Sequence, residues 1–559
     1  MANNKTVPPK ENWTDQEKWV WEKLCAGEEA DFNKPSDPEK EKLYGGYIDP
    51  KDDKVWNLKN ENAKNRILSP EFLETILHEK SYCNVLTRKG VRIEGAWITK
   101  QIDLSFVTFD HVLALGRSRF SCYVDLSFFK SSRLVSFQGS AFKSELNMNS
   151  IQISNSLFLR EGTEFNAVIL RGAKIAGNLE MNKAVFEDEL NMNGISVEGA
   201  LFMRESIGRG EVNLINAKIG KTLEMDKSMF EKKLEMDKIY IGSSLFMREA
   251  NFGRVFIKSA KIGSQIDMSD SDYTNDLYIE KLLVDENFSL SYTTLKKSLY
   301  LLFSKIGGNL EIISSLKGEK LASIDLTGTD IKGELFLGTN MSSLAQWEEG
   351  AKLTLRNTSV GTIQDLENSW PDELELRGFT YSNLGGFAGG DEKSMAEREV
   401  SKLIKWLKKQ KEYSPQPYEQ LAKVLRETGH KEKANAILYA SKQKEREKAG
   451  CGRKLWLLFL EWTIGYGYYP WWSIIWVIAF TFLGASVLLI LGQETASDIP
   501  DAFIYSLDML LPVIRLDEAH YSSAIQLVDN VKYYFYLHKI VGWFLATIFI
   551  AGLSGITKK

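Results

Sequence analysis

The sequence is poor in the residues from which most catalytic and metal sites are built. Among its 559 residues there are 4 cysteines and 5 histidines. The cysteines match no metal-binding or redox spacing; they are Cys25, Cys83, Cys122 and Cys451. The sequence contains no zinc-protease motif, nucleophile elbow, phosphate-binding lysine loop or dinucleotide fingerprint. We therefore expect no enzyme, no cofactor and no metal site, with free thiols in a reducing compartment.

An excess of charge of one sign is also missing. The chain has 70 Lys and Arg against 74 Asp and Glu, a net charge of −4, whereas a nucleic-acid-binding protein would carry a basic surface. We therefore expect no nucleic-acid partner. The first ten residues contain no apolar run, so no cleavable signal peptide is expected.

The sequence does contain an internal repeat of 11 residues. An apolar-x-apolar triplet recurs from Val91 to Leu310, with one residue missing before Val255, and weaker units start at Ile324, Leu335, Leu353 and Leu374. In many units a second apolar residue lies seven places after the first, often behind a small residue. Alternation of this kind is the period of a strand and not of a helix. Short strands at a fixed spacing predict a mainly β fold, a right-handed parallel β-helix or solenoid.

Charged residues set the length of one coil. In two series of residues spaced 22 apart, which we call columns, the type of side chain alternates. This predicts that residues 22 apart lie one strand spacing, about 4.8 Å, from each other. One coil then contains two 11-residue units. The first column is Glu161, Lys183, Glu205, Lys227 and Glu249, and the second is Arg160, Asn182, Arg204, Asp226 and Arg248.

This repeat resembles the pentapeptide-repeat type of β-solenoid, although its unit has 11 residues and the five-residue pattern of that family is absent. The resemblance implies a scaffold or a molecular mimic, with an unknown protein partner on the solenoid face. Since the charges alternate in sign along the columns, we interpret them as a solvated structural surface.

Composition divides the rest of the chain. We expect an N-terminal cap over residues 1–90, the solenoid over 91–384, a basic helical linker over 391–450 and a membrane domain over 451–559. The linker pattern predicts helices over 394–412, 418–428 and 431–447. Between residues 391 and 454 there are 17 Lys and Arg and 10 Asp and Glu, which favours an anionic cytoplasmic membrane surface.

Two segments are predicted to span a bilayer, residues 471–491 and 537–556. Trp and Tyr residues before the first span form an interfacial belt. Basic residues flank the start of the first span and the end of the second, so both termini are expected in the cytoplasm. The membrane is expected to be the plasma membrane, specifically a bacterial inner membrane.

Between the spans lies an apolar stretch, residues 501–514, which is too short to cross and predicts a re-entrant or interfacial helix. The order of span, short helix and span resembles the two-transmembrane pore-loop channel fold, but the potassium-filter signature does not follow the short helix. A filter-like run at 463–467 lies before the first span, and we expect an interfacial turn there. Candidate pore or re-entrant residues are Asp508, Ser506, Thr547, Gly552 and Ser554. In the alternative interpretation the short helix lies flat at the interface and Asp508 faces water.

Two functions follow from these patterns. The first is a homo-oligomeric ion channel gated through the cytosolic solenoid, because two spans cannot enclose a pore alone. The second is a membrane-tethered binding scaffold without transport, in which the spans are only an anchor in the lipid bilayer.

Overall fold

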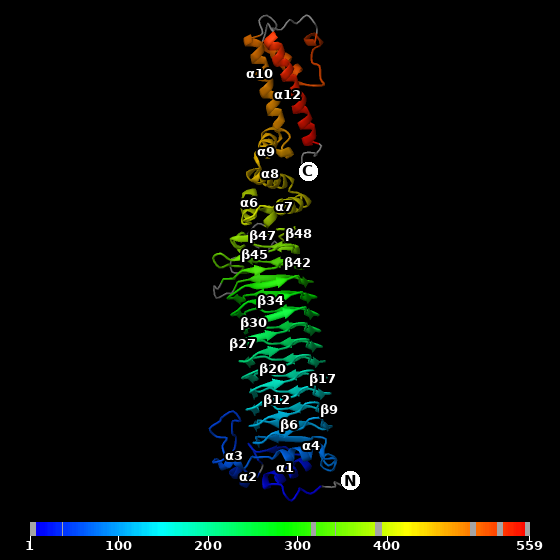
Figure 1. Cartoon of the computed structure of the whole chain (residues 1–559), viewed down its shortest axis with the longest axis vertical. Helices are drawn as coiled ribbons and strands as arrows, with labels where there is room; N and C mark the ends of the chain where they lie inside the picture. The colour runs from blue at the N-terminus through cyan, green and yellow to red at the C-terminus, as the bar shows by residue number, and fades with distance from the viewer. Residues whose placement is uncertain are drawn as a thin grey trace. The chain divides into compact units, whose positions relative to one another are not determined.

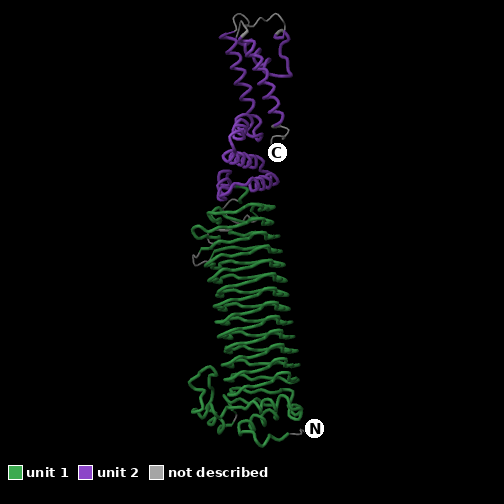
Figure 2. The backbone as a smooth tube through the Cα atoms, in the orientation of Figure 1, with its two compact units in different colours: residues 1–397 green, residues 398–559 purple. Residues whose placement is uncertain are grey.

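The computed structural model divides the chain into two compact units, Met1–Glu397 and Arg398–Lys559 (Figure 2). We call them the solenoid unit and the helical unit. The structure describes residues 7–35, 37–314, 320–340, 343–385, 394–491, 499–521 and 529–553.

The N-terminal part of the solenoid unit is a small helical layer built around buried tryptophans. A strand within it, β1 (Ala30–Asp31), pairs in parallel with β2 (Val91–Glu94), so this layer covers the open edge of the first coil. The amphipathic stretch that begins at Ser69 forms α4, and Ser69 caps its first turn. The helices are α1 (Asp15–Cys25), α2 (Pro38–Tyr44), α3 (Glu61–Lys64), α4 (Pro70–His78) and α5 (Lys80–Cys83).

The prediction of a parallel β-solenoid with 22 residues per coil is confirmed (Figure 1). The solenoid has about 13 turns. The weaker repeat units after Leu310 also form turns, since Leu310 is paired with Leu335 and Ile324 with Leu353. Each coil carries four short strands, so the strands form four ladders of parallel pairs. In the first coil these strands are β2 (Val91–Glu94), β3 (Trp97–Ile98), β4 (Ile102–Asp103) and β5 (Thr108–Phe109). In the second they are β6 (Leu113–Gly116), β7 (Arg119–Phe120), β8 (Val124–Asp125) and β9 (Lys130–Ser131).

The register follows the repeat, including its irregularities. Leu157 is paired with Leu179, and Leu179 with Leu201. The shortened unit appears where β27 (Met229–Glu235) pairs with β30 (Asn251–Lys258), because the spacing there falls from 22 to 21 residues. Gly253 lies at this point, where a Cβ would be 2.4 Å from the carbonyl oxygen of Glu231. The last coils end with β45 (Lys352–Thr354), β46 (Ser359–Gln364), β47 (Glu373–Glu375) and β48 (Thr380–Leu384).

Apolar ladders fill the interior of the solenoid. The first and third residues of each triplet are buried and the second points outward, as at Leu157, Phe158 and Leu159. Stacked rings continue this pattern, with centroids 4.3–5.5 Å apart along Phe120, Phe142, Phe165 and Phe186. Burial of this kind supplies the main stabilisation of the unit.

In each unit from Val91 to Leu299, the residue four places after the first apolar residue has a positive φ. Glycine occupies this position in some units, such as Gly139, Gly172 and Gly194, but a long side chain occupies it in others. Lys183 and Glu205, with φ of 62° and 55°, are examples. The left-handed conformation allows a tight turn at the corner of the coil. The sequence pattern did not predict this, because the position is not restricted to glycine.

The helical unit starts with short helices and ends with longer ones. Its elements are α6 (Val400–Lys408), α7 (Pro415–Glu427), α8 (Lys431–Lys448), α9 (Cys451–Ile464), η3 (Gly465–Gly467), α10 (Trp472–Leu491), α11 (Ile499–Leu510), η4 (Glu518–Tyr521) and α12 (Asp529–Leu553). The first predicted linker helix is shorter than expected, since α6 begins at Val400. In contrast, α7 begins at Pro415, because a proline in the first turn of a helix forfeits no hydrogen bond.

Candidate functional site

The candidate site is the group of helices α9 to α12. Both α10 and α12 contain a stretch long and apolar enough to cross a membrane, Trp472–Leu491 and Asn530–Ala551. The first agrees with the predicted span 471–491. The second begins earlier than predicted, and the predicted end at residues 554–556 lies outside the described residues.

These two helices are not the buried core of a folded domain. Only 22% of the apolar window of α10 and 28% of that of α12 are buried. Ile490 is 78% exposed and Ile540 is 65% exposed, although both are large apolar side chains. A surface of this kind is stable only in contact with lipid or another apolar partner.

Helix α11 lies between α10 and α12 at two close approaches, each made possible by a glycine. A Cβ on Gly484 of α10 would lie 2.2 Å from the Ser506 hydroxyl, and a Cβ on Gly542 of α12 would lie 1.7 Å from the Leu510 carbonyl oxygen. Gly542 therefore packs directly against the short helix α11 of the same chain. The predicted loop helix 501–514 ends earlier, at Leu510, because Pro512 follows.

Ser506 is fully buried and joins the three helices through polar bonds. Its hydroxyl donates to the carbonyl oxygen of Thr481 at 2.9 Å and lies 3.4 Å from Nε2 of His538. His538 also contacts the Ser506 carbonyl oxygen at 3.2 Å and the Tyr534 hydroxyl at 3.3 Å. These contacts satisfy polar groups that would otherwise be costly in an apolar environment.

Asp508 is also fully buried, and its carboxylate holds the segment that follows α11. It accepts hydrogen bonds from the backbone N–H of Leu516 at 2.8 Å and from the Tyr521 hydroxyl at 3.3 Å. Nδ1 of His520 lies 3.0 Å from the other carboxylate oxygen. Asp508 therefore fastens the loop to the helix, a role that neither interpretation of the sequence had assigned to it.

The remaining candidate positions lie on α12 or beyond it. Thr547 is exposed, and its hydroxyl donates to the carbonyl oxygen of Trp543 at 2.7 Å in the preceding turn. Gly552 belongs to the last described turn of α12, and Ser554 lies outside the described residues. Since Ser506 and Asp508 are buried and Thr547 points outward, these side chains do not share one surface.

The filter-like run at 463–467 forms the end of α9 and a turn. Gly465 ends α9 in the left-handed conformation, and Tyr466 has a φ of 57°. The helix is attached to α8 through Glu461, which accepts hydrogen bonds from Tyr439 and Gln443, both at 2.9 Å, and pairs with Arg446. Burial, together with the adjacent Glu461 carboxylate, raises the pKa of Tyr439 to about 12 and keeps its hydroxyl a donor.

The charge columns of the solenoid form separate pairs instead of continuous columns. Lys183 lies 3.6 Å from Glu205, and Lys227 lies 3.5 Å from Glu249. Glu161 instead lies 3.3 Å from Arg117, two coils away, because Gly139 occupies the coil between them.

The second column is rearranged in a similar way. Arg248 pairs with Asp226 at 2.5 Å as expected, whereas Arg160 pairs with Glu180 and Arg204 with Glu224, at 2.5 and 2.8 Å. Each of these arginines also covers an outward-facing phenylalanine two residues before it. The sequence pattern identified the charges but not these partners.

Within the described ranges there is no cluster of three or more His, Cys, Asp or Glu side chains that would hold a metal ion. No known family model matches the chain, and no curated protein or solved structure is significantly similar to it. The likeness to pentapeptide-repeat solenoids and to pore-loop channels therefore remains a resemblance of sequence pattern.

Proposed function

We propose that this protein is a membrane-anchored scaffold, in which α10 and α12 span the bilayer and the solenoid binds a protein partner. The observation that carries the proposal is the exposed apolar surface of two helices of spanning length. The proposal gives the chain no catalytic role. In this proposal the bilayer is a bacterial inner membrane, and both termini lie in the cytoplasm.

The orientation follows from the basic residues before α10. Helix α8 ends with Lys444, Arg446 and Lys448, and Arg453 and Lys454 follow at the start of α9. Basic segments next to a span stay on the cytoplasmic side, where the lipid surface is anionic. This supports a cytoplasmic position for the start of α10.

The outer surface of the solenoid supports a binding role. Phe106 and Phe128 stack on each other with ring centroids 4.8 Å apart, yet they are 72% and 41% exposed. Both have positive φ, a conformation that is unfavourable for a bulky residue. Aromatic side chains that lie together on the surface are a feature of protein-recognition sites, so this pair supports a binding role.

Burial of the candidate pore residues favours the scaffold over the channel. A residue that lines a pore between copies must lie on the surface of each copy, but Ser506 and Asp508 are both 0% exposed. Their polar atoms are already bonded within the chain.

The anchor is tested by fractionation of cells that produce the full-length chain. We expect the protein in the membrane fraction after a sodium carbonate wash, and we expect the double variant Ile478→Asp with Leu483→Asp to lose this retention, because both side chains are exposed on α10. The control variant Phe106→Asp carries the new charge on the solenoid and should stay in the membrane. Wild-type protein in the soluble fraction would refute the anchor.

A homo-oligomeric channel is the second candidate, and one observation favours it: a short helix fixed between two helices of spanning length. The loop after it exposes Val513, Ile514 and Leu516, which a second copy would cover. Purified protein in planar bilayers separates the two functions. Silent bilayers across several salts support the scaffold, whereas a conductance that changes in Thr547→Ala or Asp508→Ala supports the channel.

A further inference from the structure

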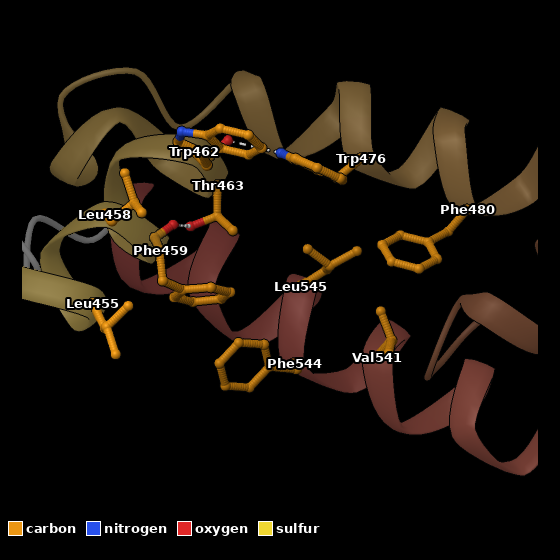
Figure 3. Close-up of a pocket in the computed structure, with 10 residues that line it drawn as sticks. All are labelled: Leu455, Leu458, Phe459, Trp462, Thr463, Trp476, Phe480, Val541, Phe544 and Leu545. Carbon is orange, nitrogen blue, oxygen red and sulfur yellow. Dashed lines mark hydrogen bonds between the residues drawn. The ribbon is translucent and has the colours of Figure 1, made fainter. Parts of the chain in front are cut away.

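The helical unit contains an apolar cavity of about 420 Å³ between α9, α10 and α12 (Figure 3). The polar groups of Thr463 and Trp476 in its lining are already hydrogen-bonded. The Thr463 hydroxyl donates to the carbonyl oxygen of Phe459 at 2.9 Å, and Nε1 of Trp476 donates to the carbonyl oxygen of Trp462 at 2.7 Å. An occupant would meet mainly aliphatic and aromatic side chains and must therefore be apolar itself.

One end of the cavity lies next to two exposed basic residues, and at the other end the rings of Phe480 and His538 lie 6.4 Å apart. Leu455 of α9 lies at one end in Figure 3, and Phe480 and Val541 lie at the other. Arg453 and Lys454 immediately precede Leu455, and both are exposed. Arg453 pairs with Glu445, whereas Lys454 has no ion pair among the described residues.

Two exposed tryptophans lie on the same helix as these basic residues. Trp456 and Trp462 are 53% and 62% exposed on α9. Exposed tryptophans beside basic residues are typical of the depth at which lipid head groups lie. The charged end therefore fits a negatively charged head group, and the apolar end fits a hydrocarbon chain.

The size of the cavity suits a narrow chain better than a helix from a second copy. One turn of an α-helix, roughly 10 Å wide and 5.4 Å long, already fills about 400 Å³. A flexible hydrocarbon chain needs no such width. The volume also lies within the range of about 300–1,000 Å³ that is common for sites of small ligands.

We propose that the cavity binds one acyl chain of an anionic phospholipid, with the head group at Lys454. This site rests on the proposed function, since it requires α10 and α12 to lie in a bilayer. The bound lipid would fill the space between α9 and the helices α10 and α12 and would hold α9 against them.

The test uses full-length protein in mild detergent, stripped of lipid and incubated with an equal mixture of phosphatidylglycerol and phosphatidylcholine. Native mass spectrometry then counts the lipids that stay bound. We expect one retained phosphatidylglycerol in the wild type. Val541→Phe should lower its occupancy about tenfold, because excluding two methylene groups is sufficient for that loss. The control Ile540→Phe adds the same ring to the exposed neighbouring position and should leave occupancy unchanged.

A second variant tests the head group. Lys454→Gln should lower the preference for phosphatidylglycerol over phosphatidylcholine about fivefold, the effect of one lysine at an anionic surface. Lys423→Gln, which removes an exposed lysine of α7, should not change the preference. Equal losses in Val541→Phe and Ile540→Phe, or no retained lipid in the wild type, would overturn the proposal. A change in oligomer mass without a change in lipid count would assign the cavity to contacts between copies.

Fractionation of the same variants separates this site from the anchor. If Val541→Phe and the wild type both stay in the membrane while neither retains lipid, the lipid site fails and the anchor stands. If the wild type is soluble, the anchor fails irrespective of the lipid count.

Discussion

The solenoid and the helices α10 to α12 distribute polarity in opposite ways. In the solenoid, Leu201 is 0% exposed, while Lys183 and Glu205 face outward. In the helices, Ile490 is 78% exposed, while Ser506 and Asp508 are fully buried. The first arrangement suits water, and the second suits lipid or another apolar surrounding. The two regions of the chain are therefore suited to different surroundings.

The two regions also differ in how contacts relate to sequence. Residues in contact within the solenoid are 21 to 25 places apart over most of its length, so one repeat reveals most of its pairing. Contacts among α10, α11 and α12 follow no period. The predictions below test this difference, beginning with the largest expected effect.

Replacing one glycine at a close contact between coils should damage the solenoid strongly. Gly220, Gly242 and Gly263 stack on one another, and a Cβ on Gly242 would lie 2.2 Å from the Gly220 carbonyl oxygen. We expect Gly242→Ala to lower the free energy of unfolding of these coils by about 3 kcal/mol, because the backbones must separate. Hydrogen exchange of peptides over residues 219–263 measures the loss.

Gly194→Ala is the matched control. Gly194 has a φ of +67° and open space around its Cβ position, so its cost is conformational only, about 1 kcal/mol. Equal losses in the two variants would show that close contact between coils does not limit stability.

The first coils contain a carboxyl group that makes stability depend on pH. Burial raises the pKa of Glu94 from 4.5 to about 7; the nearby Arg117, 3.2 Å away, opposes this, and Glu29, Asp31 and Glu161 add to it. The folded state keeps its proton where the unfolded chain has lost it. The resulting stabilisation is complete below about pH 4.5 and is lost as the pH rises through 7.

We expect the protection of residues 91–116 to fall by an amount on the order of 2 kcal/mol between pH 5 and pH 8. Hydrogen exchange corrected for its intrinsic pH dependence measures this fall. It should disappear in Glu94→Gln and persist in Glu205→Gln, which removes an exposed carboxylate. A pH-independent wild type would contradict the role of Glu94.

In the helical unit, the largest effect of a polar substitution is expected at Asp508. Asp508→Ala removes the acceptor for Leu516 and Tyr521 and should release the loop at a cost of about 1.5 kcal/mol. Limited proteolysis of the detergent-solubilised protein at Arg515 reports the release. Asp501→Ala, at an exposed position in the first turn of α11, should leave the cleavage rate unchanged. Equal cleavage of both variants would show that Asp508 does not hold the loop.

The contrast between the regions explains how much was predictable. The repeat was sufficient to predict the strands and the coil length, and hydropathy was sufficient to predict the position of α10 and of most of α12. The pattern also recorded small residues at buried corners, and the structure gives the reason. There the Ser206 hydroxyl donates to the Met181 carbonyl oxygen of the coil before, at 2.7 Å, so a small polar side chain can satisfy a backbone carbonyl in the interior.

Other features depend on contacts that no period encodes. Glu461 holds α9 on α8, and Asp508 holds a loop eight residues away. The partner of each carboxylate depends on how the helices pack in three dimensions, and no repeat in the sequence records that packing. Burial of Ser506 and Asp508 was likewise not predictable, since a polar residue in an apolar helix fits both a pore and a helix-helix contact.

The smallest effect should come from the charge columns, although they were the clearest guide to the coil length. The side chains of Lys227 and Glu249 are 57% and 59% exposed, and their charged atoms are 3.5 Å apart. Such surface pairs contribute about 0–1 kcal/mol and weaken with salt. We expect Lys227→Ala to change the stability of its coils by less than about 0.5 kcal/mol, and the change should vanish in 1 M salt. Hydrogen exchange over residues 223–249 measures it, with Leu223→Ala as the contrasting variant, since loss of a buried leucine costs about 2–5 kcal/mol. A loss at Lys227 as large as that at Leu223 would mean that the columns hold the coils together as well as record their spacing.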